Sequence, residues 1–247
     1  MDVRVVLVEP KRDENVGAVA RVMKNFGFYS LYIVGDSVGE KAFYVAYHAE
    51  DVLEKCKFVR TLEEAIAGSH IVVGTTAKTA SENNVLRNFV EPERLREIIE
   101  GKNGILTLVF GREDFGLLNE ELRKCDFIVH IPANPAYPVL NLSHAVAVVL
   151  YELSKSSRKG KGNVLKGNIG SVAGSNAVKL ASVEEKEKLL AHFREFLERV
   201  EAREHRVERT LLVLKHIFGR AGITSREVRT LHGMLRKALR ALEMHKE

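Results

Sequence analysis

The chain has 247 residues, 45% of them hydrophobic, and a net charge of +5, which suits one substantial core with an appended unit. No run of eighteen apolar residues occurs, and the start Met-Asp-Val-Arg lacks the order of a secretory signal, so we expect a cytoplasmic protein without a membrane segment. Because Cys56 and Cys125 lie far apart and form no Cys-x-x-Cys pattern, they predict neither a disulfide nor a zinc site, but two small core residues.

Five short apolar runs rich in β-branched residues are predicted to be strands that are covered on both faces. They span residues 3–8, 31–34, 71–73, 105–110 and 127–131. Helical signals fall between them: an apolar face over residues 14–26, a capping box at residues 61–64 and Pro92 in a first turn. The alternation of strand and helix predicts an α/β fold with a mostly parallel sheet flanked by helices.

The composition changes after an apolar helix predicted over residues 141–153. Residues 155–183 are rich in Gly, Ser, Asn and Lys without periodicity, which is typical of a flexible linker. Capping boxes that begin at Ser182 and Thr224 then open long amphipathic helices. We therefore expect an α/β domain over residues 1–154, a basic linker over 155–183 and an α-helical extension over 184–247.

The positive charge is concentrated in the C-terminal third. Residues 1–154 carry a net charge of −5, residues 155–183 six cations and no acid, and residues 184–247 a net charge of +4. This asymmetry suggests a polyanionic partner, because neutralised phosphates supply affinity for any sequence. A solubilising linker beside a solvated helix face explains the charge equally well.

Three segments concentrate glycine, proline, amide and charged residues directly after apolar runs. They are Asn15-Val-Gly-Ala-Val-Ala-Arg21, Phe110-Gly-Arg-Glu-Asp-Phe-Gly-Leu117 and Ile131-Pro-Ala-Asn-Pro-Ala-Tyr-Pro-Val-Leu-Asn-Leu-Ser143. Because ligands bind at the ends of parallel strands, we expect the three segments to meet in one site. A Rossmann-type dinucleotide site is disfavoured, since no Gly-x-Gly-x-x-Gly follows the first strand and no phosphate-binding Gly-x-x-x-x-Gly-Lys-Ser/Thr loop occurs.

In combination, these segments resemble the three motifs of the SPOUT family, the trefoil-knotted RNA 2′-O-ribose methyltransferases of the TrmH-like superfamily. The likeness is continuous over residues 2–154 and includes Val73-Gly-Thr-Thr-Ala77 and the segment 119–125. It is greatest for the TrmJ type, which methylates tRNA in the anticodon loop at nucleotide thirty-two. In the tail, Glu208-Arg-Thr-Leu-Leu and Val228-Arg-Thr-Leu-His-Gly-Met resemble the C-terminal helical extension of that type.

The resemblance implies a deep trefoil knot in which the last strand and helix thread through a loop, an exception to ordinary chain topology. It also implies S-adenosyl-L-methionine bent in that knot, a homodimer with the active site at the subunit interface, tRNA as substrate and no metal. Relatives commonly carry serine where this chain has Val139, a departure that is harmless if the backbone makes the contact. Matched one position at a time, the residues expected to surround the cofactor are Thr75, Thr76, Ala77, Gly111, Ile131, Pro138, Val139 and Leu140.

The same resemblance implies that Arg21 reaches the target ribose, from the other subunit of the dimer. A guanidinium with a pKa above about 12 is a poor proton acceptor, so we expect Arg21 to position a phosphate and stabilise the developing alkoxide. Asn15 is expected to organise the same loop, and Glu113 to orient Arg21 or the knot loop. Asn141 and Ser143 are expected either to bind the ribose region or to cap the helix that follows.

Three neighbours of these motifs have less specific interpretations. Arg112 and Lys78 flank the expected site, where contacts to tRNA phosphates and surface salt bridges are equally plausible. His144 is predicted to pack rather than to take part in chemistry.

Other functions are open at this level. The same chemistry on ribosomal RNA or on another tRNA position is one alternative, and a non-catalytic knotted RNA-binding protein is a second, expected if the cofactor loops were degenerate. A nucleotide-dependent oxidoreductase is disfavoured by the absent glycine fingerprint.

Overall fold

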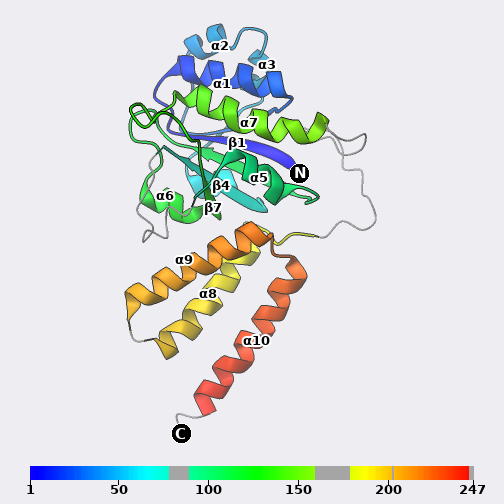
Figure 1. Cartoon of the computed structure of the whole chain (residues 1–247), viewed down its shortest axis with the longest axis vertical. Helices are drawn as coiled ribbons and strands as arrows, with labels where there is room; N and C mark the ends of the chain where they lie inside the picture. Colours follow the sequence, from blue (N-terminus) through cyan, green and yellow to red (C-terminus); the bar gives the residue numbers. More distant parts are fainter. Residues whose placement is uncertain (78–88, 159–178, 202, 245–247) are drawn as a thin grey trace.

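The described residues of this computed structural model, 1–77, 89–158, 179–201 and 203–244, form a seven-stranded sheet at the centre of the molecule (Figure 1). Every neighbouring pair is parallel, in the order β3-β2-β1-β6-β4-β7-β5, so the predicted α/β architecture is confirmed. The strands are β1 Asp2–Val8, β2 Ser30–Val34, β3 Lys57–Val59, β4 Ile71–Thr76, β5 Phe89–Val90, β6 Ile105–Phe110 and β7 Phe127–His130.

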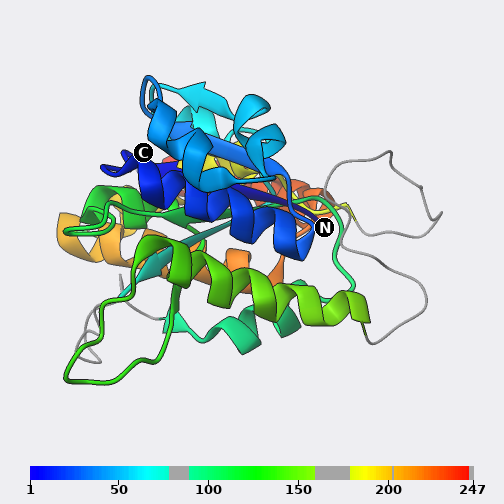
Figure 2. The same ribbon diagram turned by 90° about the horizontal axis from the view of Figure 1, so that it is seen from above.

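One face of the sheet is covered by a layer of helices in which α1 (Asp13–Phe26) and α7 (Leu142–Arg158) pack side by side (Figures 1 and 2). The amphipathic helix α1 buries Val16, Val19 and Met23, and it ends where Gly27 takes a left-handed conformation with φ 79°. The other helices of this layer are α2 Glu40–Ala46, α3 Glu50–Glu54 and α5 Pro92–Ile99.

The opposite face is covered by α4 (Leu62–Ile66) and α6 (Asn119–Lys124), and the C-terminal helices lie beneath it (Figure 1). These are α8 Val183–Val200, α9 Glu204–Ala221 and α10 Ser225–Met244. They share a small core of their own around Leu189, Phe218 and Leu235, while Val183 belongs to the core under the sheet. The extension is therefore packed against the α/β domain.

A buried ion pair holds the extension at the beginning of β7. Lys186 of α8 is 4% exposed, and its Nζ lies 2.6 Å from both carboxylate oxygens of Asp126, which is 1% exposed. The same ammonium donates to the His70 carbonyl, and the backbone N–H of Val72 donates to Asp126 Oδ2. Since a buried charge requires a partner, this pair fixes how the two units dock.

The predicted linker is shorter than expected at both ends. Helix α7 continues to Arg158, and Leu180 and Ala181 are buried, with Leu180 bridged to Thr224. The predicted bounds 155–183 are therefore wrong at their ends, because the apolar surface near residue 180 packs into three cores: Leu180 into the core beside α1 and α7, Val183 into the core under the sheet, and Ala181 into the core of the extension. The middle of the segment, 159–178, lies outside the described residues.

Several elements differ from the sequence-based expectation. Strands β3 and β5 and helices α2 and α3 were not predicted; they have three, two, seven and five residues, too few to produce a clear periodicity. The path from β4 to β5 runs through residues 78–88, which lie outside the described residues, so the threading of the knot stays a prediction. In the described ranges, no helix is long and apolar enough to cross a membrane.

Candidate functional site

A cavity of about 370 Å³ opens at the carboxyl ends of β4, β6 and β7. Its walls come from three loops: residues 75–77 at the end of β4, residues 110–119 between β6 and α6, and residues 131–142 between β7 and α7. All eight positions expected to surround a cofactor line it: Thr75, Thr76, Ala77, Gly111, Ile131, Pro138, Val139 and Leu140. The parallel order of the strands is what brings these distant segments together.

The β6–α6 loop folds back on itself at two glycines. Gly111 leaves so little room that an added Cβ would lie 2.2 Å from the carbonyl carbon of Gly116. Gly116 has φ 73°, a left-handed conformation that favours glycine. Arg112 and Gly116 exchange backbone hydrogen bonds of 3.2 and 2.9 Å across this tight turn. The loop therefore presents its backbone to the cavity in one fixed shape.

Arg112 anchors that loop from behind. It is 7% exposed, and its guanidinium donates in a fork to both oxygens of Glu121, at 3.0 Å each, and through Nε to Glu9 at 2.9 Å. Glu121 also accepts from the backbone N–H of Leu118 at 2.7 Å. Burial lowers the pKa of Arg112, but the bonds and charges of Glu9 and Glu121 outweigh this and raise it. Of the two interpretations of Arg112, the structure supports the salt bridge, although the guanidinium itself is buried and only its partner Glu9 is exposed. A phosphate contact is disfavoured, because the charge of Arg112 is already engaged by two carboxylates.

A ladder of hydrogen bonds joins the three motifs. Asn15 Nδ2 donates to Glu113 Oε1 at 2.8 Å, Asn141 Nδ2 donates to Asn15 Oδ1 at 2.9 Å, and the Ser143 hydroxyl donates to Asn141 Oδ1 at 2.8 Å. Asn141 Oδ1 also accepts from the backbone N–H of Ser143 at 2.9 Å. Asn141 thus caps α7 and at the same time belongs to the polar site, so its two interpretations are compatible.

Glu113 is held as a carboxylate. Burial raises its pKa, but hydrogen bonds from Asn15 and from the backbone N–H groups of Lys11 and Arg12 outweigh it, so the pKa is lowered overall. Asp114, next in the chain, pairs with Lys11 at the surface. Glu113 and Asp114 both line the cavity, and because Asp114 is neutralised by Lys11, Glu113 is the carboxylate that gives the lining a negative character.

The cavity fits the cofactor that the resemblance implies. Apolar side chains such as Leu117, Ile131 and Leu142 supply flat walls for a purine ring, and the three loops supply main-chain donors and acceptors for its edge. A sulfonium is cationic, and the Glu113 carboxylate in the cavity lining is electrostatically suited to it. Val139 is 53% exposed and lines the cavity, which allows its backbone to make the contact.

Arg21 lies outside this cavity. It is exposed on α1, six residues beyond Asn15, and among the described residues it forms no hydrogen bond or ion pair. Within one chain the structure therefore brings together Asn15, Glu113, Asn141 and Ser143 but leaves Arg21 apart from them. His144 is also exposed, so the prediction that it packs is wrong, and Lys78 lies outside the described residues.

Sequence reasoning missed Glu9, Glu121 and Phe115. The Phe115 ring lies 5.2 Å from the guanidinium carbon of Arg112 and lines the cavity. The acidic residue at the third position of α6 was a possible signal for Glu121, because a glutamate there often binds back to the N-cap. In the ranges that the structure describes, no group of three or more His, Cys, Asp or Glu is placed to hold a metal ion. Burial raises the pKa of both Cys56 and Cys125 to about 12, so both stay protonated thiols.

Comparisons with known proteins agree with this geometry. The model of the SpoU rRNA methylase family matches residues 2–151. The chain is 40% identical over 232 residues to the tRNA (cytidine-2′-O-)-methyltransferase TrmJ of Methanocaldococcus jannaschii, covering 93% of this chain and 96% of that protein. The crystal structure of TrmJ from Z. mobilis ZM4 matches with a TM-score of 0.73 and 27% identity, covering 96% of this chain and 99% of that one. An AdoMet-bound rRNA methyltransferase from Sinorhizobium meliloti shares the fold, with a TM-score of 0.50, 21% identity, and 63% of this chain and 56% of that one covered.

Proposed function

Because the chain belongs to the SpoU rRNA methylase family, we propose that it methylates the 2′-hydroxyl of a tRNA ribose in the anticodon loop, at nucleotide thirty-two. The methyl donor is S-adenosyl-L-methionine, and cytidine is the expected base, as in the archaeal relative. The observation that carries the proposal is that the second and third motifs line one cavity, while the first motif is joined to both by the ladder from Glu113 through Asn15 and Asn141 to Ser143.

The choice of tRNA is supported by the extent of the likeness. The relative from M. jannaschii, whose name specifies tRNA, aligns with 93% of this chain, so the alignment must include much of the C-terminal extension as well as the α/β domain. A SpoU methyltransferase acting on ribosomal RNA or on another tRNA position is the alternative, since the family model is named for rRNA.

The residues of this chain divide the work. When bound, S-adenosylmethionine supplies an electrophilic methyl group on a sulfonium. The loops around Gly111 and Leu140 hold that group in a fixed orientation and exclude water, so that alignment of the attacking oxygen becomes the main remaining task. The ladder keeps Asn15 and Asn141 in one orientation next to Glu113, which lines the cavity.

Arg21 acts on the RNA side. Its guanidinium is permanently charged and exposed, so it binds the phosphate beside the target ribose and stabilises the developing alkoxide. The hydroxyl proton passes to phosphate or water, because Arg21 cannot accept it. Since Arg21 stands apart from the cavity of its own chain, we propose that it serves the cavity of a second subunit in a homodimer.

Mapping of the product tests the proposed reaction. Purified protein is incubated with labelled S-adenosylmethionine and with unmodified tRNA or ribosomal RNA, and mass spectrometry locates the methylated nucleotide. We expect one 2′-O-methylated cytidine in the anticodon loop of tRNA. Methylation confined to ribosomal RNA, or to a base, contradicts the proposal.

Mixed dimers test the partition of the site. An Arg21→Ala protomer keeps its cavity, whereas an Ala77→Phe protomer keeps Arg21 but has a filled cavity. If Arg21 acts across the interface, mixing the two inactive variants restores activity at one of the two sites in each mixed dimer. If Arg21 acts within its own chain, the mixture stays inactive.

A further inference from the structure

Three aromatic side chains gather on the outer surface of α2 and of the residue that follows it, at the top of the molecule in Figure 1. Tyr44 is 87% exposed, Tyr47 63% and Phe43 38%. Ala42 and Ala46 of the same helix are buried, so α2 turns its small residues inward and its rings outward. We call Phe43, Tyr44 and Tyr47 the aromatic patch. Since large rings usually lie in a core or an interface, their joint exposure indicates a surface that meets a partner.

The backbone at the end of α2 is strained where it carries the patch. Tyr47 has φ 21° and His48 has φ 64°, both in the left-handed region that favours glycine. Among the described non-glycine residues only Glu9 shares this feature, and Glu9 binds the arginine that anchors the β6–α6 loop. The rings of Tyr47 and His48 lie against each other, with centroids 4.1 Å apart. Strained residues of this kind cluster at active sites and ligand sites.

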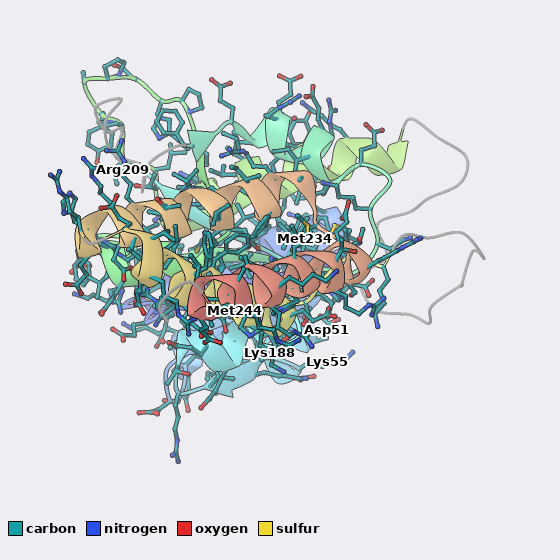
Figure 3. The ribbon with its side chains drawn as sticks, turned by 90° about the horizontal axis from the view of Figure 1, so that it is seen from below. Asp51, Lys55, Lys188, Arg209, Met234 and Met244 are labelled. Atoms are coloured by element: carbon teal, nitrogen blue, oxygen red, sulfur yellow. The ribbon has the colours of Figure 1, made fainter. Side chains whose placement is uncertain are left out.

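Arg21 lies beside this patch. Helix α2 crosses α1 at Gly17, where an added Cβ would lie 2.3 Å from the Ala42 carbonyl oxygen. Arg21 is four residues further along the same face of α1, and Lys24, three residues beyond it, pairs with Asp51 of α3 at 2.7 Å. Asp51 is labelled in Figure 3, where the molecule is seen from below. Arg21 is therefore positioned between the two points where α2 and α3 meet α1, next to the connection that joins them.

The acids around Arg21 are engaged with other cations. Glu14 lies 3.6 Å from Lys41, and Asp51 pairs with Lys24. Within the ranges that the structure describes, no carboxylate pairs with Arg21, so a permanent cation and three rings are exposed on one surface. This combination suits single-stranded RNA, because a guanidinium binds phosphate and an aromatic ring stacks on a base.

We propose that the aromatic patch stacks on an unpaired RNA base next to the ribose that Arg21 holds. The proposal rests on the proposed function and deepens it, because it names the side chains that position the nucleotide. Bases in a tRNA loop are accessible for stacking, and every base has a flat face that a ring can cover. Since Arg21 serves the cavity of a second subunit, the patch of one subunit then faces the RNA at the cavity of the other.

A contact between protein subunits explains the patch less well. The patch is small, and the exposed polar residues Glu40, Lys41 and His48 border it. A stable protein interface needs a larger apolar centre from which charged residues are depleted. A stacked base needs only one or two rings beside a cation.

The absence of tryptophan from the chain provides a direct test. The Tyr47→Trp variant keeps a large flat ring and contains a single indole. Unmodified tRNA is titrated into this variant and into Phe58→Trp, whose replaced ring is 41% exposed on the edge strand β3, while filter binding measures the bound fraction. We expect tRNA to quench the indole emission of Tyr47→Trp and to leave that of Phe58→Trp unchanged. An unquenched indole in Tyr47→Trp with tRNA bound overturns the proposal.

A matched pair of double variants separates stacking from simple apolar contact. Tyr44→Phe/Tyr47→Phe keeps both rings, whereas Tyr44→Leu/Tyr47→Leu keeps apolar side chains without a ring. We expect the leucine variant to lose about tenfold in kcat/KM for tRNA, because stacking is lost, and the phenylalanine variant to keep the wild-type value. The thermal midpoint and the affinity for S-adenosylmethionine should be unchanged in both. A wild-type kcat/KM in the leucine variant, or an equal loss in the phenylalanine variant, contradicts stacking.

Two controls complete the test. Tyr47→Gly removes one ring at a position whose φ favours glycine, so its fold is not at risk, and its kcat/KM for tRNA should also fall. Sedimentation of the leucine variant tests the other occupant: if the wild-type protein is a dimer and this variant is a monomer, the patch is a subunit contact and the proposal is overturned.

Failure of this inference is distinguishable from failure of the proposed function. If the wild-type protein methylates tRNA but tRNA does not quench the indole of Tyr47→Trp, only the stacking fails. If the wild-type protein methylates ribosomal RNA and not tRNA, the proposed function fails, and quenching of the same indole by ribosomal RNA still supports stacking on a base.

Discussion

The carboxyl ends and the amino ends of the parallel strands use the same kinds of polar groups in opposite ways. At the carboxyl ends of β4, β6 and β7, backbone and side-chain groups surround an open cavity. At the amino ends, the C-terminal helices satisfy them: Glu184 accepts from the Gly68 N–H, Lys186 pairs with Asp126, and Lys102 donates to the Arg220 carbonyl. The carboxyl ends are thus available to a ligand, and the amino ends are part of the folded core.

This difference shows that the role of a buried ion pair depends on where the pair lies in the fold. Arg112 with Glu121 and Lys186 with Asp126 are both buried charge pairs. The first shapes a loop that lines the cavity, and the second joins two structural units. Substitutions near the cavity should therefore change activity or cofactor affinity, whereas substitutions at the amino ends of the strands should change stability. Experiments can test whether the two kinds of effect are separate.

The largest expected effect on activity comes from Arg21, which lies outside the cavity and outside the contacts between the α/β domain and the extension. Arg21→Ala should lower kcat by about 10²–10³-fold, the usual loss when one charge-stabilising donor is removed. The affinity for S-adenosylmethionine, measured by calorimetry, should stay unchanged, because the cavity does not include Arg21. An equal loss of cofactor affinity would contradict the assignment of Arg21 to the RNA side.

At the amino ends of the strands, Lys186→Met should lower the free energy of unfolding by about 3–5 kcal/mol, because it leaves the Asp126 carboxylate buried without a partner. Chemical denaturation measures this loss. The double variant Lys186→Met/Asp126→Asn should recover most of it, since no buried charge remains. Cofactor affinity of the folded protein should not change in either variant. A parallel loss of affinity would contradict the separation between the cavity and the amino ends of the strands.

The pH dependence of stability should also arise at the amino ends of the strands, where the extension packs, through His216. His216 of α9 is 2% exposed, its Nε2 has no partner within the described residues, and burial, assisted by Arg220, lowers its pKa from 6.5 to about 4. Between pH 6.5 and 4 the His216 side chain binds a proton in the unfolded chain but not in the folded one. The free energy of unfolding is therefore not reduced by His216 above pH 6.5, and it falls as the pH drops toward 4. The loss is at most about 3 kcal/mol.

Denaturation at several pH values in wild type and in His216→Phe measures this contribution. The variant should have a flatter profile between pH 6.5 and 4. Identical profiles would show that other groups, such as His70, whose pKa burial also lowers, account for the dependence.

The smallest expected effect is on cofactor affinity through Arg112. Arg112→Gln removes the fork that holds the β6–α6 loop, so the dissociation constant for S-adenosylmethionine should rise about tenfold, a cost of about 1.4 kcal/mol. The matched control is Arg4→Gln: Arg4 is 9% exposed and donates to the Ala65 and Ala67 carbonyls away from the cavity. Equal losses of affinity in both variants would mean that general destabilisation, not loop geometry, is responsible.

The sequence predicts those parts of the fold in which a long, regular pattern meets a buried face. Strands β1 and β6 are nearly continuous apolar runs because both of their faces are covered, and α1 and α10 show clear amphipathic periodicity. The edge strands β3 and β5 have only three and two residues, so tertiary pairing and not local pattern creates them. The docking of the extension was also out of reach, because Lys186 and Asp126 are sixty residues apart.

The candidate site divides in the same way. Cavity positions such as Gly111 and Leu140 follow strands, and parallel order brings strand ends together, so their meeting was predictable. The burial of Arg112 was not, because it requires Glu9, directly after β1, and Glu121 from α6 to arrive on either side of one guanidinium.

Every donor in the ladder is oriented toward the same end. The Ser143 hydroxyl donates to Asn141, Asn141 donates to Asn15, and Asn15 donates to Glu113. A single negative charge on Glu113 therefore gives polarity to side chains from two other, distant segments, and successive bonds of this kind reinforce one another. If Glu113 were replaced by an uncharged amide, the Asn15 amide would lose the charge that fixes its orientation, whereas Asn141 would still be oriented by the backbone N–H of Ser143. The two halves of the ladder would then no longer be set by the same group.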